Sequence, residues 1–285
     1  MNGLGPLSGI FWWVIFLIMI NIRIKISNIK KSVVIFTFVS IIVLLIDAYY
    51  RFFISTKSLE YGFYAYKYGL IGVDSNFAGL FAMLVFICFD HSIDKSKIKS
   101  VVLFVVFLLL FITFSRSAII CTVFYLVFFK LKKTTLVFSL PIFLVFTIPL
   151  VFILELLPKT IDESGFSKLE LLIEYVSYYS NSSLDLILFG FGLGGLKVGD
   201  LNPHLLPLQI LTGYGLVGFC LFFGLMGALI TTFKSTRKII IPYLLASFSV
   251  APIGSGVLIF SLYIFIRIEY DRSLLLRRSK LQTAA

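Results

Sequence analysis

The fold is decided by residues 98–130, which read IKSVVLFVVFLLLFITFSRSAIICTVFYLVFFK. Ser115 and Arg116 interrupt two apolar runs near the middle of this stretch. A single helix over the whole stretch would be roughly 50 Å long, whereas the hydrocarbon core of a bilayer is about 30 Å thick. The stretch therefore predicts a hairpin of two membrane helices that turns at Ser115 and Arg116.

The composition of the whole chain agrees with a membrane setting. Of 285 residues, 59% are hydrophobic and only 14% are charged, whereas a soluble domain has roughly 45–50% apolar and about 25% charged residues. These proportions exclude a soluble enzyme, a DNA-binding domain and a secreted disulfide scaffold. The cysteines Cys88, Cys121 and Cys220 each lie alone in an apolar stretch without metal or redox spacing, so we interpret them as packing residues.

Apolar runs of near-bilayer length predict an all-α polytopic membrane protein with about eight or nine transmembrane helices. We treat residues 1–285 as a single integral membrane domain. We expect the first run to be a retained span, because it has no basic n-region and no small-residue cleavage site. The expected spans lie near 7–22, 33–50, 69–89, 98–114, 117–129, 134–154, 208–233, 239–250 and 253–266.

Basic residues set the expected orientation of a chain whose net charge is +11. With the hairpin in place, the basic clusters after the first, third, fifth and seventh spans fall on one face, which the positive-inside rule makes cytoplasmic. The basic tail joins that face if the chain crosses twice between 239 and 266; a single span with an outer tail is the weaker alternative. The positive charge thus reflects topology and requires no nucleic-acid partner. The clusters are Arg23, Lys25, Lys30 and Lys31, then Lys95, Lys97 and Lys99, then Lys130, Lys132 and Lys133, then Lys234, Arg237 and Lys238, and in the tail Arg267, Arg272, Arg277, Arg278 and Lys280.

One long stretch does not fit as a span. Residues 155–204 hold seven acidic side chains against three lysines, and the expected topology makes residues 155–207 a large periplasmic loop. Loops longer than about 12–15 residues are usually functional, so we expect the chemistry of the protein there. Ionisable residues are nearly absent inside the spans, which argues against a proton-driven transporter but leaves a flippase with a polar cavity open.

Two polar residues, Arg116 and Asp74, lie near the expected outer ends of spans. Arg116 either snorkels to the headgroups or binds free helix carbonyls, or it presents a guanidinium that binds a phosphate with two hydrogen bonds. Asp74 is interpreted as the N-cap of the helix that follows, because Asp caps helices well.

The outer loop adds a glycine-rich segment and a histidine. The segment from Gly190 to Gly195 lacks the strand–helix context of a nucleotide site, so we interpret it as a tight approach to the membrane. His204 either caps the following helix or accepts a proton from a sugar hydroxyl near neutral pH. His91, in the expected cytoplasmic loop, is interpreted as solvated surface. A lone histidine without a Cys/His cluster makes a zinc site unfavourable.

Taken in order, these segments resemble the O-antigen ligase and O-antigen polymerase family of bacterial envelope glycosyltransferases. The resemblance spreads over roughly residues 70–260. It rests on residues 72–78 (GVDSNFA), 113–117 (TFSRS), 190–192 (GFG), 203–204 (PH) and 213–218 (GYGLVG).

The resemblance implies an all-helical membrane fold and an undecaprenyl-diphosphate-linked oligosaccharide as donor. The acceptor would be a sugar hydroxyl of lipid A-core (ligase) or of the growing glycan (polymerase), on the outer face of the inner membrane. No metal, nucleotide sugar or other cofactor is implied. By this analogy Arg116 and Lys168 would bind the diphosphate and His204 would deprotonate the acceptor. Asn202 would bind substrate, although the family's Asn follows the histidine and here Leu205 does.

Two other classes compete with this expectation. A transporter or flippase for the same lipid-linked sugar would need a broad polar cavity through the bundle. A non-catalytic scaffold for envelope assembly would tolerate loss of Arg116 and His204. In each class membrane lipids surround the protein, and a chain-length regulator or another envelope-assembly protein is a candidate partner.

Overall fold

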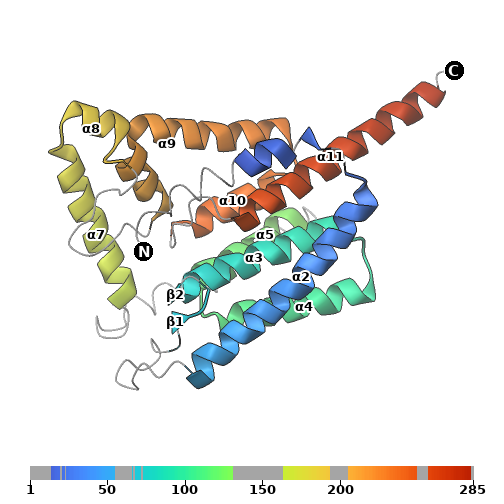
Figure 1. Ribbon diagram of the computed structural model, residues 1–285, viewed down its shortest axis with the longest axis horizontal. Helices are drawn as coiled ribbons and strands as arrows, with labels where there is room; N and C mark the ends of the chain where they lie inside the picture. The colour runs from blue at the N-terminus through green and yellow to red at the C-terminus, as the bar shows by residue number, and fades with distance from the viewer. Residues whose placement is uncertain are drawn as a thin grey trace.

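The structure is a computed structural model that describes residues 14–19, 21–22, 24–54, 66, 68–71, 73–130, 163–192, 205–248 and 256–283. These residues are mostly helical (Figure 1). The helices are α2 (Ile26–Tyr49), its π-helical continuation η1 (Tyr50–Ile54), α3 (Ser75–Ser92), α4 (Lys97–Ile112), α5 (Arg116–Lys130), α7 (Glu163–Ser180), α8 (Leu184–Phe189), α9 (Leu206–Thr232), α10 (Arg237–Ala246) and α11 (Gly256–Thr283). Two short strands, β1 (Tyr68–Gly69) and β2 (Val73–Asp74), pair antiparallel.

The predicted break of residues 98–130 into two helices is confirmed. α4 ends at Ile112, α5 begins at Arg116, and residues 113–115 form the turn between them. The two helices run in opposite directions. Lys99 at the start of α4 and Lys130 at the end of α5 both reach the carboxylate of Asp90, at 3.0 and 2.6 Å.

α3 lies at the centre of the bundle. It packs against α2, α4, α5, α10 and α11 (Figure 1), and nearly all of its side chains are buried. Small residues on a membrane helix let neighbouring backbones approach closely. At Gly79 the backbone of α3 lies directly against Ser115, because a Cβ atom on Gly79 would lie only 2.2 Å from the Cβ atom of Ser115.

The helices around α3 expose apolar side chains outward. On α4 these recur every three or four residues, which is the spacing of one helix face. They are Ile98, Val101, Phe104, Leu108 and Phe111. An apolar face of this size fits lipid better than water. By length and composition, three helical segments of the described chain can cross a membrane: Ile26–Ile54, Ser75–Ser92 and Leu206–Thr232.

The expected spans correspond unevenly to these helices. The spans near 33–50, 98–114, 117–129 and 208–233 overlap α2, α4, α5 and α9. The span near 69–89 is only partly correct, because β1 and β2 precede α3, which begins at Ser75. The last two differ in length from the prediction, since α10 has 10 residues and α11 has 28. The span near 134–154 lies outside the described residues, and the one near 7–22 is described only in part.

The basic clusters that the structure describes meet at one end of the bundle, as the sequence predicts. Lys30 at the start of α2 pairs with Asp94 after α3, at 2.6 Å. Arg267 of α11 donates a hydrogen bond of 3.4 Å to the carbonyl of Ile24. Together with the two lysines on Asp90, these contacts define what we call the basic end.

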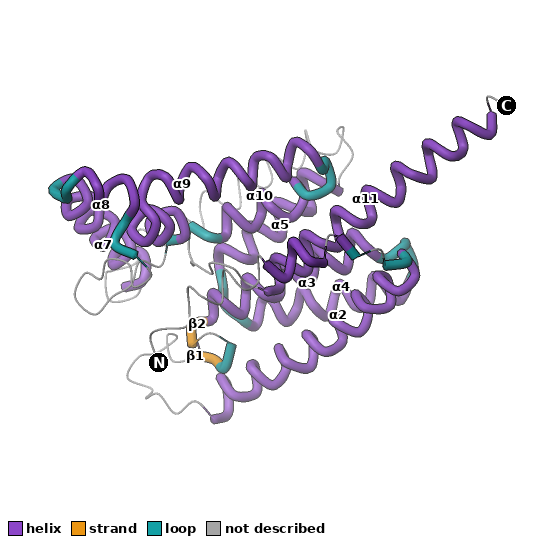
Figure 2. The backbone as a smooth tube through the Cα atoms, turned by 45° about the horizontal axis from the view of Figure 1, so that its top comes forward, coloured by secondary structure: helices purple, strands orange, loops and turns teal. Residues whose placement is uncertain are grey.

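Contacts at both ends of α10 show that it runs away from the basic end, antiparallel to α9. Just before α10, the hydroxyl of Ser235 donates to the carbonyl of Phe265 on α11, at the basic end. After α10, the carbonyl of Ser247 accepts from the N–H of Leu206, 3.0 Å away, at the start of α9. The opposite end, which we call the distal end, holds η1, both strands, the 113–115 turn and the start of α9. Figure 2 shows the strands beside the end of α2.

Two local interpretations from the sequence are wrong. His91 is not solvated surface: its ring is partly buried and stacks on Phe265, with centroids 4.0 Å apart and planes 15° apart. Cys220 is not a packing residue, because it is exposed on α9, whereas Cys88 and Cys121 are buried as expected.

Candidate functional site at the distal end

The distal end holds a buried ion pair between Asp47 of α2 and Arg51 of η1. The two residues are 2% and 1% exposed, so both charges are removed from solvent. Burying charges costs several kcal/mol per ion unless further hydrogen bonds satisfy them. The remaining contacts of this pair are therefore informative.

Both partners of the ion pair bind backbone from other segments. The Oδ1 atom of Asp47 accepts from the N–H groups of Leu70 and Ile71, at 2.7 and 2.9 Å, in the turn after β1. The Nη1 atom of Arg51 donates to the carbonyl of Thr113, at 3.3 Å, where α4 ends. The pair thus joins α2 to the β1 turn and to the turn between α4 and α5.

The 113–115 turn is itself strained and well supported. Phe114 has φ of +54°, a left-handed conformation that is a true outlier for a bulky residue. The Phe114 ring packs edge-on against Phe52 of η1, with centroids 6.1 Å apart. The hydroxyl of Ser115 lies 3.2 Å from the amide oxygen of Asn76 on α3. Strain of this kind persists only where the surroundings determine the backbone, and it clusters at functional sites.

Arg116 follows this turn directly as the first residue of α5, and it is partly buried. Asp74 immediately precedes α3, in the place predicted for a cap, and also pairs with Tyr68 in the short ladder. The structure therefore brings the segments around residues 72–78 and 113–117 together through Asn76 and Ser115.

The glycine-rich segment and the glycines of α9 also meet. The N–H of Phe191 donates to the carbonyl of Thr212 at 2.7 Å, and that of Gly192 donates to Gly213 at 3.0 Å. Gly190 and Gly215 both have positive φ. A Cβ atom on Gly190 would lie 2.5 Å from the backbone nitrogen of Gly215, and a Cβ atom on Gly215 would lie 2.2 Å from the carbonyl oxygen of Leu188. Within α9, which begins at Leu206, Gly215 has non-helical dihedral angles and interrupts the helix.

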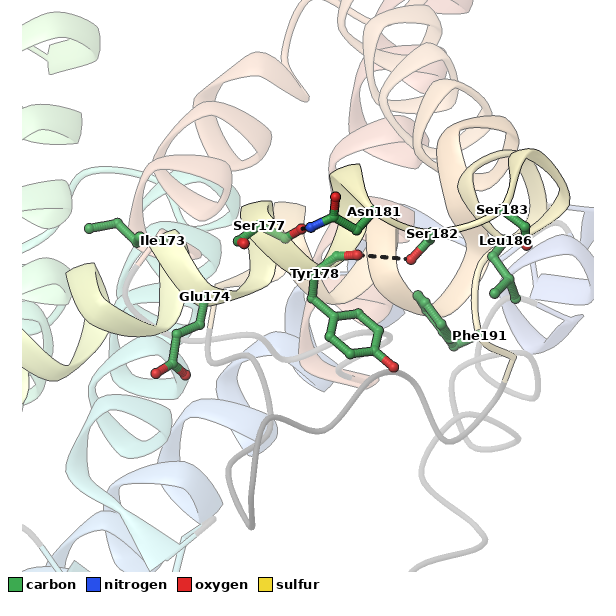
Figure 3. Close-up of a pocket in the computed structure, with 9 residues that line it drawn as sticks. All are labelled: Ile173, Glu174, Ser177, Tyr178, Asn181, Ser182, Ser183, Leu186 and Phe191. Atoms are coloured by element: carbon green, nitrogen blue, oxygen red, sulfur yellow. Dashed lines mark hydrogen bonds between the residues drawn. The ribbon is translucent and has the colours of Figure 1, made fainter.

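A groove runs along α7 and α8 beside this contact (Figure 3). Its volume is about 820 Å³. The rings of Tyr178 and Phe191 lie next to each other, with centroids 5.9 Å apart, and Glu174 points to the same side (Figure 3). Side chains that mix aromatic faces with polar groups suit a ligand with both apolar and hydroxyl surfaces. The other lining residues are Ile173, Ser177, Asn181, Ser182, Ser183 and Leu186.

Local contacts hold the turn between α7 and α8. The hydroxyl of Tyr179 donates to the carbonyl of Ile187, and burial raises the pKa of this phenol. A hydrogen bond from the Ser183 side chain lowers the pKa of Asp185, near the start of α8. The raised pKa keeps the Tyr179 hydroxyl protonated as a donor at neutral pH, and the lowered pKa keeps Asp185 ionised as an acceptor.

The structure locates only some of the predicted site residues. Lys168 lies in α7. Asn202 and His204 lie outside the described residues. Leu205, next to His204 in the chain, is the N-cap of α9 at the distal end. Within the described part of the chain, no group of three or more His, Cys, Asp or Glu residues could hold a metal ion.

Sequence reasoning missed Arg51. Asp47 and Arg51 are four residues apart, and an Asp and an Arg with this spacing lie on one helix face and can pair. Two opposite charges with this spacing at the end of an apolar run are the signal that could have found the pair. Its backbone partner Thr113 is distant in sequence and carries no such signal.

Comparison with known proteins identifies no relative: no family model, no curated protein and no solved structure matches the chain.

Proposed function

We propose that the chain is a membrane glycosyltransferase of the O-antigen ligase or polymerase kind. It transfers a glycan from an undecaprenyl-diphosphate carrier to a sugar hydroxyl on the periplasmic face of the bacterial inner membrane. In this proposal eight or nine helices span the membrane, the basic end is cytoplasmic, and residues 155–207 form a periplasmic loop that includes α7 and α8.

One observation carries the proposal. Segments far apart in the sequence, on which the resemblance rests, come together in two pairs. Asn76 meets Ser115, and Gly192 meets Gly213. Contacts between distant segments are what a site built from several loops requires, and they support a shared role within each pair.

The proposed reaction uses residues at this end. His204 removes the proton from the acceptor hydroxyl, whose oxygen attacks the anomeric carbon of the donor sugar. The bond from that carbon to the diphosphate oxygen breaks, and undecaprenyl diphosphate leaves with the electron pair. Arg116 and Lys168 neutralise the developing negative charge, which cations in a water-poor site stabilise strongly. Asn202 and the groove on α7 and α8 hold the glycan.

A transporter of the same lipid-linked sugar is less well supported. Such a protein needs a polar path through the bundle, whereas α3, at the centre of the described helices, is packed by apolar side chains along most of its length. Translocation of a lipid-linked oligosaccharide in liposomes containing only this protein would nevertheless favour transport over transfer.

The deciding experiment is deletion of the gene in its host, followed by gel analysis of lipopolysaccharide and of the undecaprenyl-linked glycan pool. Core that carries a single repeat unit identifies a polymerase. Bare core with long polymer on the carrier identifies a ligase. If both pools are unchanged, or if a variant lacking both Arg116 and His204 restores transfer, the proposal is wrong.

A further inference from the structure

The buried pair of Asp47 and Arg51 is not explained by the proposed reaction. Arg51 is only 1% exposed, so a lipid diphosphate at the surface of the bundle does not reach it. Replacing a buried ion pair by apolar residues is often neutral or stabilising. A role other than stability is therefore the better account of two charges buried here.

The contacts of the pair point to the turn before Arg116. Arg51 donates to the carbonyl of Thr113, and its neighbour Phe52 packs on Phe114. Two consecutive residues of η1 thus bind two consecutive residues of the strained turn. A π-helical turn redirects side chains relative to an α-helix and often marks a functional site, and here it aims both side chains at the same three-residue segment.

The same pair fixes η1 from the other side. Asp47 accepts the N–H groups of Leu70 and Ile71, and Gly69 leaves the space that the pair occupies. A Cβ atom on Gly69 would lie 2.5 Å from Oδ1 of Asp47 and 2.6 Å from Nε of Arg51. The pair is therefore held between the turn after β1 and the 113–115 turn, and these contacts leave the Asp47 and Arg51 side chains little room to move.

We propose that Asp47 and Arg51 are positioning residues, which hold the 113–115 turn so that Arg116 is presented at the distal end in one fixed place. This inference rests on the proposed function for its purpose, because Arg116 is the diphosphate ligand there. The structural part of the inference does not depend on that function: breaking the pair moves residue 116 while the rest of α5 stays packed.

Thiol labelling measures this movement directly. In the full chain, Cys220→Ser removes the exposed cysteine, and Arg116→Cys places a reporter after the turn. Cys121 is buried on the same helix and reports whether α5 itself has opened. The rate of labelling by a water-soluble maleimide is compared with and without Asp47→Leu combined with Arg51→Met, which removes both charges at once.

The matched control removes another ion pair. Lys30→Gln with Asp94→Asn breaks the exposed pair at the basic end, far from the turn. We expect the rate at position 116 to change about threefold or more when the buried pair is removed, with Cys121 still unlabelled. A rate that equals that of the Lys30 and Asp94 control overturns the inference, and so does simultaneous labelling of Cys121, which would indicate a purely structural role.

A second variant decides the case if the double replacement does not fold. Arg51→Lys keeps a cation beside Asp47 but lacks the planar fork that reaches two acceptors, so it should also shift the rate at position 116. An unchanged rate overturns the inference.

Transfer assays separate this inference from the proposed function. With Arg116 present, loss of the buried pair should lower kcat for transfer more than it raises the KM for the lipid diphosphate donor, because a displaced Arg116 stabilises the developing charge less well. If Arg116→Ala transfers glycan normally, the proposed function fails, and the labelling result still judges the positioning role alone.

Discussion

The hydroxyl of Tyr125 on α5 donates a hydrogen bond of 2.7 Å to the carboxylate of Asp90 at the end of α3. Lys99 and Lys130 bind the same carboxylate, so one acidic side chain joins three helices at the basic end. Tyr125→Phe should lower the free energy of unfolding by about 1 kcal/mol, the usual value of one lost hydrogen bond. Thermal unfolding in detergent measures this.

Lys30→Gln is the control for this prediction, because its ion pair with Asp94 is exposed and such pairs contribute about 0–1 kcal/mol. Asp90→Asn should destabilise more than Tyr125→Phe, since it leaves two lysines without their shared anion. Equal stability of Asp90→Asn and the parent would contradict this account.

Gly79→Ala should disrupt the packing of α3 against the 113–115 turn. The new methyl group would overlap Ser115, and overpacking of this kind typically costs about 1–3 kcal/mol. Gly224→Ala and Gly227→Ala on α9 are matched controls, because a Cβ atom there meets nothing within 4 Å. Both should stabilise their helix by about 0.5–1 kcal/mol. A Gly79→Ala protein as stable as these controls would mean that α3 and the turn are not in contact.

Three glycines between α8 and α9 should differ in their tolerance of alanine. Gly190→Ala and Gly215→Ala combine positive φ with a clash against backbone, so each should detach α8 from α9. Gly192→Ala carries the same dihedral penalty, about 1–2 kcal/mol, but meets open space. Limited proteolysis between α8 and α9 should accelerate strongly for the first two variants and weakly for the third. The reverse order would rule out the backbone pairing described at this site.

Arg116→Ala should reduce glycan transfer about a hundredfold or more, because a charge-stabilising group is removed from the proposed reaction. Arg116→Lys should recover only part of the activity, since a lysine cannot bind a phosphate with two parallel hydrogen bonds. Lys168→Arg should be tolerated, because it keeps the charge. Transfer is followed as the glycan on the acceptor lipid, at matched protein levels, and full activity of Arg116→Ala would remove this residue from the mechanism.

Tyr178→Ala should weaken glycan binding in the groove on α7 and α8, with an increase in the KM for the glycan donor and little change in stability. Tyr178→Phe keeps the ring beside Phe191 and should retain most of the affinity. Ser180→Ala is a control on the same helix, because Ser180 does not line the groove. If Tyr178→Ala and Ser180→Ala have the same KM, the groove does not hold the glycan.

The sequence predicts the parts of this fold that depend on local patterns. The apolar runs on both sides of Ser115 and Arg116 predict the hairpin, and the lysine clusters predict which ends of the helices share one side. The hairpin follows from the length of the stretch compared with the thickness of a bilayer, and the shared side follows from the positions of the charges. Neither prediction depends on contacts between distant segments.

Contacts between distant segments could not be predicted in the same way. The ring of His91 stacks on Phe265, and Arg51 binds the carbonyl of Thr113; in each case the partner is far away in sequence. The break in α9 at Gly215 is also hidden, because the apolar pattern continues through it and only the approach of Gly190 requires the unusual dihedral angles.

The central place of α3 has a consequence for how the molecule is made. A ribosome delivers α3 to the membrane long before α10 and α11, which cover part of its surface. Until α10 and α11 are inserted, lipid must cover the part of α3 that they contact. The side chains of α3 there are mostly apolar, so contact with lipid costs little. Asp90 is different, because its partner Lys130 arrives with α5. Biogenesis should therefore proceed in two stages, with α3, α4 and α5 forming an early intermediate that the later helices complete.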